Sequence, residues 1–542
     1  MTRIAMIGGG PKCLYALLEL NDSLPPHLAG ELQVDVYDPY PPGAGRVWNT
    51  AQPRELKLNV NPRIIDASSN LCSQDFNRWQ EARNIASADG SFPARALVGE
   101  YLREQFERLA EHGSLPVAHR SCVVDGVARK GPHWEVRTVH GTELYDEVVL
   151  ATGHGLGGYR AEDSPRGSIS AAALTVEHDQ AEDDTVLAGS KVVIKGAALT
   201  AYDVVLRLTE GRGGRWETTT SDGLEFLRYI PSGEEPVSIT MTSRSGIPMT
   251  PKPNTRPASV DEVLDGYRDQ VRQWGIERHG TATGGKLLHP GLDELWQILL
   301  SCAMECAKAS GSETDQDALW KTLRDGKLEQ MAERTSAAEE LRASVRINHG
   351  LAAPSTQWVW GTVWSGLYPQ LVDALTRISW NADEREQFKT LAANLERMAF
   401  GPPEPTALKL LALFEDGLLH HEQSDLSVFA GAALTIDAVT APAGVLYASS
   451  SGGDSASSLF SDLLAEGEVQ VRAGERGLLT DTDGTCLDST GERNESLTAL
   501  GRPTEDPTLG HDTLNRGLHL EYRGWARRIA RQVAASQQKV AQ

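Results

Sequence analysis

The start of the chain alternates between apolar runs and a glycine-rich turn in the pattern of a βαβ unit. Residues 3–7 and 32–37 are short apolar runs with the length of buried strands. Between them, residues 14–20 carry apolar side chains at helical spacing, and residues 8–13 form a turn with three consecutive glycines. Because hydrophobic period and run length predict the type of element, we expect strand, turn, helix and strand with a right-handed crossover.

A second unit of the same kind is expected farther along the chain. Its elements are, in order, a strand at 191–195, a turn at 196–198, a helix at 199–208 and a strand at 238–242. Ahead of it, residues 146–153 have the pattern of a buried strand that ends in a glycine turn. Two further segments alternate in the manner of antiparallel strands, 117–124 and 134–139.

The hydrophobic period changes to that of amphipathic helices from about residue 260 to residue 421. The helices expected there are 292–307, 317–347, 358–378 and 384–398. After this helical region, short strands are expected at 434–439, 445–448 and 469–471, and a final helix at 521–535. The pattern therefore predicts an α/β chain with a helical insertion between its first and last strands.

Composition narrows the classes of partner. Of the 542 residues, 52 are Lys or Arg and 74 are Asp or Glu, which leaves a net charge of −22. Such an acidic chain disfavours nucleic acid and anionic membrane surfaces as partners, because phosphate binding needs basic surface. No run approaches the ~18 apolar residues of a spanning helix, and the N-terminus lacks the pattern of a signal peptide. The six cysteines are scattered without C-x-x-C spacing, so we expect no metal site and a reducing, cytoplasmic location.

The first glycine turn carries the main chemical signal. Gly8 permits a tight turn after the strand, and Gly10 lets the backbone approach a pyrophosphate at the helix N-terminus. Cys13 replaces the third glycine of the G-x-G-x-x-G pattern. Asp38 ends the second strand, where an acidic side chain hydrogen-bonds a ribose hydroxyl. Strand, glycines, helix and acid-ended strand in this order predict dinucleotide binding.

A second turn indicates which dinucleotide the first site takes. Ala151, Thr152 and Gly153 close an apolar strand long after the first glycine turn. Flavoproteins that bind two dinucleotides use such a turn where the chain leaves the FAD domain. Together with the first glycine turn, it favours FAD over NAD.

The second βαβ unit would bind the nicotinamide nucleotide. Its turn begins with Gly196 but has alanine, Ala198, at the second glycine position, and this methyl group would crowd a pyrophosphate. Arg244 favours binding, because a cation after the second strand pairs with the 2′-phosphate of NADPH. The alternative is a unit that has kept its fold and lost its cofactor.

The predicted fold class is therefore α/β, with two Rossmann-like dinucleotide-binding domains and a helical insertion. We expect a discontinuous FAD-binding domain over residues 1–185 and 430–542. The NAD(P)-binding-like domain is expected over 186–257 and the helical insertion over 258–429.

Several sequence motifs together resemble one family. They are GGGP at 8–11, PGAGRVW at 42–48, LKLNV at 56–60, DFNRW at 75–79, FPARALVGEYL at 92–102, LTAYD at 199–203, GRGG at 211–214, SRSG at 243–246, AFGPP at 399–403 and LGRPTE at 500–505. This combination is similar to bacterial FAD/NAD(P)-binding flavoproteins that include N-hydroxylating monooxygenases, among them those that oxidise aspartate toward nitrosuccinate. The resemblance covers most of the chain, and the helical insertion matches least.

The resemblance implies FAD, NADPH and dioxygen as reactants. In such enzymes a hydride reduces the flavin, oxygen adds as a C4a-hydroperoxyflavin, and the distal oxygen passes to the amine of an amino acid or small amine. Two alternatives stay open: a flavin oxidase or reductase without oxygen transfer, and a non-catalytic flavin-binding protein. The sequence leaves the substrate and self-association into a homo-oligomer undecided.

The resemblance also implies a set of site residues. The FAD positions are Gly8, Gly10, Pro11, Asp38, Arg46, Trp48, Leu58, Asn59, Gly153, Gly501 and Thr504, and the NADPH positions are Gly196, Thr200, Ser243 and Arg244. Asn59 would orient the nicotinamide or the hydroperoxide. Arg502 would balance negative charge on reduced flavin, or would only pair with Glu505. An acidic amino-acid substrate needs a cation beside its carboxylate, and Arg346 and His349 are the candidates.

Overall fold

Two units make up the chain, and each has its own parallel sheet. The structure is a computed structural model that describes all residues except 86–91, 156–166, 178–179, 222, 254, 281–290, 327–335, 425, 430–431, 450–452 and 541–542. The first unit comprises Met1–Glu162, Val176–His178 and Ala441–Gln542, and the second comprises Asp163–Thr175 and Asp179–Thr440.

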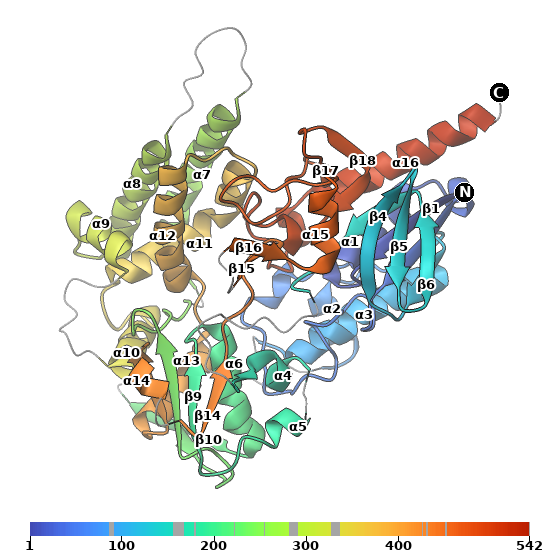
Figure 1. The fold of residues 1–542 in the computed structure, drawn as a ribbon. Helices are drawn as coiled ribbons and strands as arrows, with labels where there is room; N and C mark the ends of the chain where they lie inside the picture. Colours follow the sequence, from blue (N-terminus) through green and yellow to red (C-terminus); the bar gives the residue numbers. More distant parts are fainter. Residues whose placement is uncertain are drawn as a thin grey trace. The chain divides into compact units, whose positions relative to one another are not determined.

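The first unit is organised around a six-stranded sheet (Figure 1). Its strand order is β17 (Thr485–Leu487), β18 (Arg493–Ala499), β7 (Glu147–Leu150), β1 (Thr2–Ile7), β2 (Leu32–Tyr37) and β3 (Val117–Arg120). All neighbours pair in parallel except β17 and β18, which pair antiparallel. Strands from both ends of the sequence therefore share one sheet.

Alternation along the central strand explains the two faces of this sheet. In β1, Ile4 and Met6 belong to one hydrophobic core, and Ala5 and Ile7 to another. The first core contains residues of α1 (Pro11–Ser23), α3 (Arg95–His112) and α16 (Glu521–Val540). The second contains residues of the antiparallel strands β4 (Val124–Lys130), β5 (His133–Thr138) and β6 (Gly141–Tyr145), and of α15 (Ser458–Ala465).

The second unit has a five-stranded, all-parallel sheet. Its strand order is β13 (Leu419–Gln423), β12 (Ser238–Ser243), β9 (Lys191–Lys195), β14 (Leu434–Asp437) and β8 (Ile169–Ser170). Helix α6 (Leu199–Leu208) follows β9 and packs in the core of this sheet, together with α10 (Ala337–Asn348) and α13 (Glu404–Glu415). An antiparallel hairpin, β10 (Arg215–Ser221) and β11 (Leu224–Ile230), adjoins the same core.

Five helices of the second unit pack on one another. They are α7 (Ala258–His279), α8 (Leu292–Ser310), α9 (Gln316–Asp325), α11 (Thr356–Leu375) and α12 (Ala382–Ala399). The fully buried Trp360 of α11 donates its indole N–H to the carbonyl of Leu319 in α9, at 2.8 Å. The shorter elements are η1 (Pro26–Glu31), η2 (Pro62–Ile64), α2 (Phe76–Ala82), α4 (Ala171–Thr175), α5 (Gln180–Asp183), η3 (Glu210–Arg212), α14 (Leu426–Phe429), β15 (Leu446–Ser449), β16 (Gly453–Ala456), η4 (Arg502–Thr504) and η5 (Arg516–Leu518).

The predicted α/β fold class with two parallel-sheet units is confirmed, while three predicted elements are wrong. The segment 117–124 is not antiparallel, because α3 forms a crossover that brings β3 into parallel pairing with β2. Residues 469–471 form no strand. The apolar signal at Val469 reflects its burial in a core and not a strand. The single helix expected at 317–347 is instead α9 and α10, and residues 327–335 lie outside the described part.

The domain boundaries stay a prediction. Strand pairing places β8 and β14 in the sheet of the second unit, although the predicted boundaries assign both to the FAD-binding domain. β14 pairs with β9, and β8 pairs with β14, so both strands belong to the parallel sheet of the second unit.

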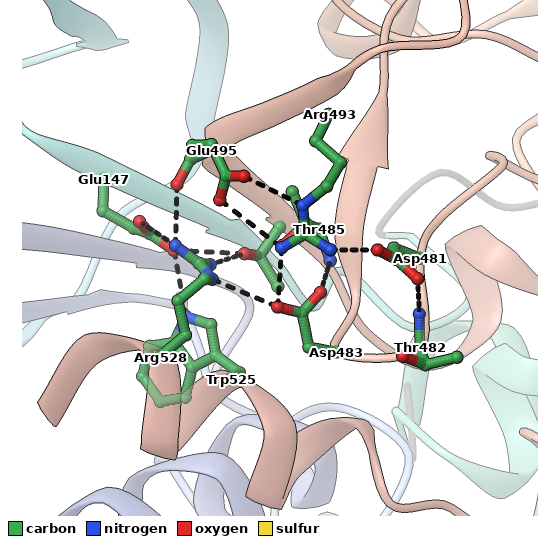
Figure 2. A network of polar contacts seen from close by, with 10 residues as sticks. Glu147, Asp481, Thr482, Asp483, Thr485, Arg493, Glu495, Trp525 and Arg528 are labelled. Atoms are coloured by element: carbon green, nitrogen blue, oxygen red, sulfur yellow. Dashed lines mark hydrogen bonds and ion pairs between the residues drawn. The ribbon is translucent and has the colours of Figure 1, made fainter. Parts of the chain in front are cut away.

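A buried ion pair fastens the last helix to the first sheet (Figure 2). The Glu147 carboxylate of β7 is 3% exposed and accepts hydrogen bonds from Arg528 at 2.6 Å and Trp525 at 3.0 Å, both in α16. Thr498 of β18 donates to the same carboxylate at 3.0 Å. Arg528 also donates to the Glu495 carbonyl of β18 at 2.6 Å. Two strands and one helix therefore meet on a single carboxylate.

We predict that Arg528→Met destabilises the protein by about 3–5 kcal/mol, because Glu147 would remain buried without its counter-ion. Urea unfolding followed by circular dichroism measures this change. The double variant Glu147→Leu/Arg528→Met should recover most of the loss, because neither charge remains.

The control is Arg228→Met, which removes an exposed ion pair with Glu217. Its unfolding free energy should change by less than about 1 kcal/mol. Equal effects of Arg528→Met and Arg228→Met would contradict the assignment of the buried pair.

Candidate functional site

Four neighbouring parallel strands of the first unit end at one edge of its sheet. These strands, β18, β7, β1 and β2, are followed by turns that begin at Leu500, Ala151, Gly8 and Asp38. Ligands of open α/β sheets bind at the carboxyl ends of the strands. The fold thus brings the predicted FAD residues of these turns to one edge, although they lie almost 500 positions apart in the sequence.

The first turn has the geometry of a dinucleotide cradle. Gly8 has φ +100°, and a Cβ placed there would lie 2.3 Å from the Ala151 carbonyl oxygen. At Gly10, by contrast, a Cβ would have no atom of the described residues within 4 Å. Helix α1 begins at Pro11, and the N-cap residue Gly10 makes no side-chain cap. Open space and uncapped N–H groups at a helix N-terminus fit an FAD pyrophosphate.

Asp38 holds this turn in place. Its buried carboxylate accepts the backbone N–H of Gly9 at 2.7 Å and that of Tyr40 at 2.8 Å. Burial raises the pKa of Asp38, and the two N–H groups act in the opposite direction. Both carboxylate oxygens therefore have backbone partners. Each oxygen keeps a lone pair that could accept a ribose hydroxyl, and this ribose contact stays a prediction.

The turn after β7 brings Gly153 and His154 to the same edge. Gly153 has φ +57°, the left-handed region that favours glycine. Arg46 donates to the Gly155 carbonyl at 3.4 Å and to the Glu177 carboxylate at 2.7 Å. Burial and, to a smaller extent, the charges of Arg502 and Arg46 lower the pKa of His154 to about 4. His154 is therefore a neutral imidazole at physiological pH.

Gly501, Arg502 and Thr504 form a compact turn after β18. Gly501 has φ +79°, and the Thr504 hydroxyl donates to its carbonyl at 2.9 Å. Arg502 forms an ion pair with Glu505 and donates to the Ala441 carbonyl at 3.2 Å. Burial raises the pKa of Glu505 to about 7, although Arg502 opposes the shift. The predicted pairing of Arg502 with Glu505 is present, and its role toward reduced flavin stays a prediction.

Three other predicted FAD residues, Trp48, Leu58 and Asn59, lie between β2 and α2 in the first unit. Leu58 is 1% exposed, and its side chain packs in the core that contains residues of α1, α3 and α16. Asn59 follows it and is half-buried. Trp48 is half-buried and packs against the same core, and its carbonyl occupies the space of a Cβ at Gly99. The predicted cofactor contacts of Trp48 and Asn59 stay predictions.

The second unit contains a smaller cradle of the same type. Gly196 has φ +118° between β9 and α6, and the N-cap residue Ala198 makes no side-chain cap. Thr200 lies in the uncapped first turn of α6. At the end of neighbouring β12, Ser243 contacts the His421 ring at 2.9 Å, and Arg244 is exposed. An uncapped helix end beside an exposed cation fits a phosphorylated nucleotide.

The two predicted substrate residues lie at the C-terminal end of α10, Arg346 in its last turn and His349 as its C-cap. His349 contacts the Glu404 carboxylate at 2.9 Å, which would balance its charge if it is protonated. Arg346 also has an interaction partner within the chain. A cavity of about 650 Å³ lies beside this helix end and is lined by residues that include Asn348, Gly350 and Trp358.

Sequence reasoning gave no role to two titratable residues at the FAD edge, Lys12 and His154, and named a third, Glu505, only as the partner of Arg502. Lys12 lies within the GGGP-containing turn motif, but its environment depends on residues near position 513. His154 directly follows the predicted glycine turn, and Glu505 ends the LGRPTE motif. The only signal for these three residues in the sequence was their position beside a motif. Their burial, which shifts their pKa values, could not be predicted from the sequence.

One described group has metal-ligand chemistry, although the sequence predicted no metal. Ligand atoms of the buried His511, His519 and Glu521 lie within 4.8 Å of one another. The two imidazole rings stack with centroids 3.8 Å apart and planes 19° apart. Separately, none of the described helices is long and apolar enough to cross a membrane.

We predict contrasting effects of alanine at two glycines of the first turn. Gly8→Ala should abolish FAD retention and lower the melting temperature, because the new Cβ collides with the Ala151 carbonyl at a positive φ. Gly10→Ala should keep the wild-type melting temperature and weaken FAD binding at least about tenfold, through contact with the pyrophosphate.

Thermal unfolding and equilibrium titration of the FAD-depleted protein with FAD measure both quantities. Unchanged FAD affinity in Gly10→Ala would contradict the placement of the pyrophosphate at this helix end.

Comparison with known proteins shows what this chain is similar to. Residues 5–155 match the FAD-NAD(P)-binding family. The chain is 30% identical over 355 residues to an L-aspartate N-monooxygenase (nitrosuccinate-forming) of Streptomyces cremeus, covering 56% of this chain and 50% of that enzyme. It is 29% identical over 313 residues to the nitrosuccinic acid synthase npaA of Aspergillus oryzae, covering 49% of this chain and 45% of the synthase. The chain thus spans about half the length of the curated relatives it matches.

A solved structure extends the likeness in fold to the whole chain. The L-lysine 6-monooxygenase of Pseudomonas syringae superposes with a TM-score of 0.50 and covers 99% of each chain, at 11% identity. At that identity the likeness concerns the fold alone. The resemblance inferred from the sequence motifs is confirmed: residues 5–155 match the FAD-NAD(P)-binding family, and about half of the chain is similar to nitrosuccinate-forming N-monooxygenases.

Proposed function

We propose that this protein is an FAD- and NADPH-dependent monooxygenase that hydroxylates the amino group of an amino acid or small amine. The similarity to two nitrosuccinate-forming enzymes, at 29% and 30% identity, carries this proposal. The cradle at the FAD edge supports it, because its open helix end fits a flavin dinucleotide.

The protein's own contribution is to hold the cofactor and to set charges around it. Bound FAD would supply the transfer of electrons and the activation of oxygen. Gly8 and Gly10 would admit the pyrophosphate, and Arg502 would place a positive charge near the flavin. The amine must be unprotonated to accept oxygen. The neutral His154 ring can accept a hydrogen bond from it, but its lowered pKa makes it a weak base.

The second cradle would bind NADPH. Gly196 and the uncapped N-terminus of α6 would face the pyrophosphate, and exposed Arg244 would pair with the 2′-phosphate. Ala198 stands at the second glycine position, and this observation favours a second candidate function. If Ala198 prevents binding, the protein would be a flavin oxidase or reductase that takes electrons from its substrate.

The named substrate of the first relative, L-aspartate, is the first amine to test. An amino acid with a side-chain carboxylate needs a cation, and Arg346 remains the proposed partner. His349 is less suited to this role, because its ring already contacts Glu404.

The deciding experiment is anaerobic stopped-flow reduction of the purified yellow protein by NADPH, followed by mixing with oxygen and an amine. Rapid flavin bleaching, and NADPH oxidation matched by hydroxylated product, is the expected result. Bleaching with the amine alone and release of peroxide would instead support the second candidate. If neither NADPH nor the amine reduces the flavin, the result would contradict both candidate functions.

We predict that Arg244→Ala raises the KM for NADPH about tenfold or more and leaves the KM for NADH within about twofold. Loss of a charge-assisted contact to the 2′-phosphate costs about 1.5–3 kcal/mol, and NADH lacks that phosphate. Steady-state oxidation of both nucleotides measures the effect.

The control is Arg228→Ala, an exposed arginine of β11 in the same unit that pairs with Glu217. It should change neither constant. Equal KM increases for NADPH and NADH in Arg244→Ala would contradict the phosphate contact.

A further inference from the structure

Lys12 connects the first glycine turn to two distant segments of the first unit. It is the second residue of α1, and its ammonium donates to the Thr513 carbonyl at 2.8 Å. Its methylene stem lies against the Gly501 turn, because a Cβ at Gly501 would be 2.9 Å from Lys12 Cγ. The ammonium also lies 5.9 Å from the ring of Tyr522 in α16. One side chain therefore spans the two turns that follow β1 and β18.

In the absence of a ligand, the charge of a lysine at this position is electrostatically unfavourable. The N-terminal end of a helix carries partial positive charge, so a cation in its first turn is electrostatically unfavourable. Burial adds a second cost and lowers the pKa of Lys12 to about 8. An anion at the uncapped helix end would offset both costs, and FAD carries a pyrophosphate and, when reduced, a negatively charged ring.

The charged groups that face Lys12 come from three segments. Asp512 lies beside Thr513, and Glu505 follows the Gly501 turn together with the positive Arg502. Glu521 lies at the start of α16. The three carboxylates raise the pKa of Lys12 and Arg502 lowers it, so Lys12 stays largely charged at neutral pH. Glu505 titrates near the same pH, because burial raises its pKa to about 7.

We propose that Lys12 is a positioning residue for the flavin, which fastens the first glycine turn to the Gly501 turn and keeps a positive charge beside the cofactor. This charge makes reduction of the flavin more favourable, because it stabilises the negative charge that reduction adds. The proposal rests on FAD binding, the cofactor part of the proposed function, and does not depend on the amine substrate.

The test measures the flavin midpoint potential of the FAD-loaded protein by dithionite titration against a reference dye. The variants are Lys12→Met, which keeps the stem that packs on Gly501, and Lys12→Arg, which keeps the charge. We expect a more negative potential in Lys12→Met and a potential close to wild type in Lys12→Arg. The difference between wild type and Lys12→Met should shrink as pH rises through about 8, where Lys12 loses its proton.

The Glu505→Gln variant separates the two groups that titrate in this range. If Lys12 is responsible, the shrinkage persists in Glu505→Gln but moves to lower pH, because the Glu505 charge that raises the pKa of Lys12 is gone. A shrinkage that disappears in this variant would overturn the assignment. Equal potentials in wild type and Lys12→Met would also overturn it, as would a Lys12→Arg potential as negative as that of Lys12→Met.

A further measurement is needed if the Lys12→Met variant binds FAD too weakly for its potential to be measured. If Lys12→Met loses FAD during purification, titration with added FAD gives its Kd. A Kd raised about tenfold or more, with Lys12→Arg near wild type, supports the proposal, and equal loss in both variants overturns it. Because the reductant is dithionite, no result depends on NADPH, oxygen or amine. A protein that takes up no FAD in wild-type form would contradict the proposed function itself.

Discussion

The carboxylate of Glu147, buried at the start of β7, sets how the two ends of the chain come together. A buried carboxylate is tolerated only with a counter-ion and satisfied hydrogen bonds, and α16 supplies both through Arg528 and Trp525. This requirement fixes α16 against β7 and β18. The residues that precede α16 include Thr513, and the residues that follow β18 form the Gly501 turn. The charge pair and the apolar residues of α16 in the same core together position the C-terminal half of the FAD edge.

The parts of the fold that were predictable are those whose signals are local. β2, β9 and α6 have the residue bounds expected from the sequence, because buried parallel strands are continuous apolar runs that glycine turns terminate. β18 was not predicted, since its sequence RNESLTA has no clear apolar run. Its strand conformation depends on pairing with β7, a contact over more than 300 positions.

The candidate site divides in the same way. Gly8 and Gly10 were identifiable because a tight turn before a helix restricts the residue type. The environments of Lys12 and Glu505 were not, because neither burial nor the charges facing them are encoded near their own positions. Asp38 shows an intermediate case. The sequence predicts an acid at the end of β2, and the structure shows that backbone N–H groups already occupy both of its oxygens.

The shared sheet of the first unit also has a consequence for the order of events during biosynthesis. β1 and α1 precede β18 and the Gly501 turn by more than 450 residues in the sequence, so they leave the ribosome well before them. At roughly 5–20 residues per second, the early half waits on the order of half a minute or longer for its partner strands. The second unit is synthesised in that interval. The turns that would hold a flavin are therefore complete only after β18 and the Gly501 turn have been synthesised, long after the first glycine turn.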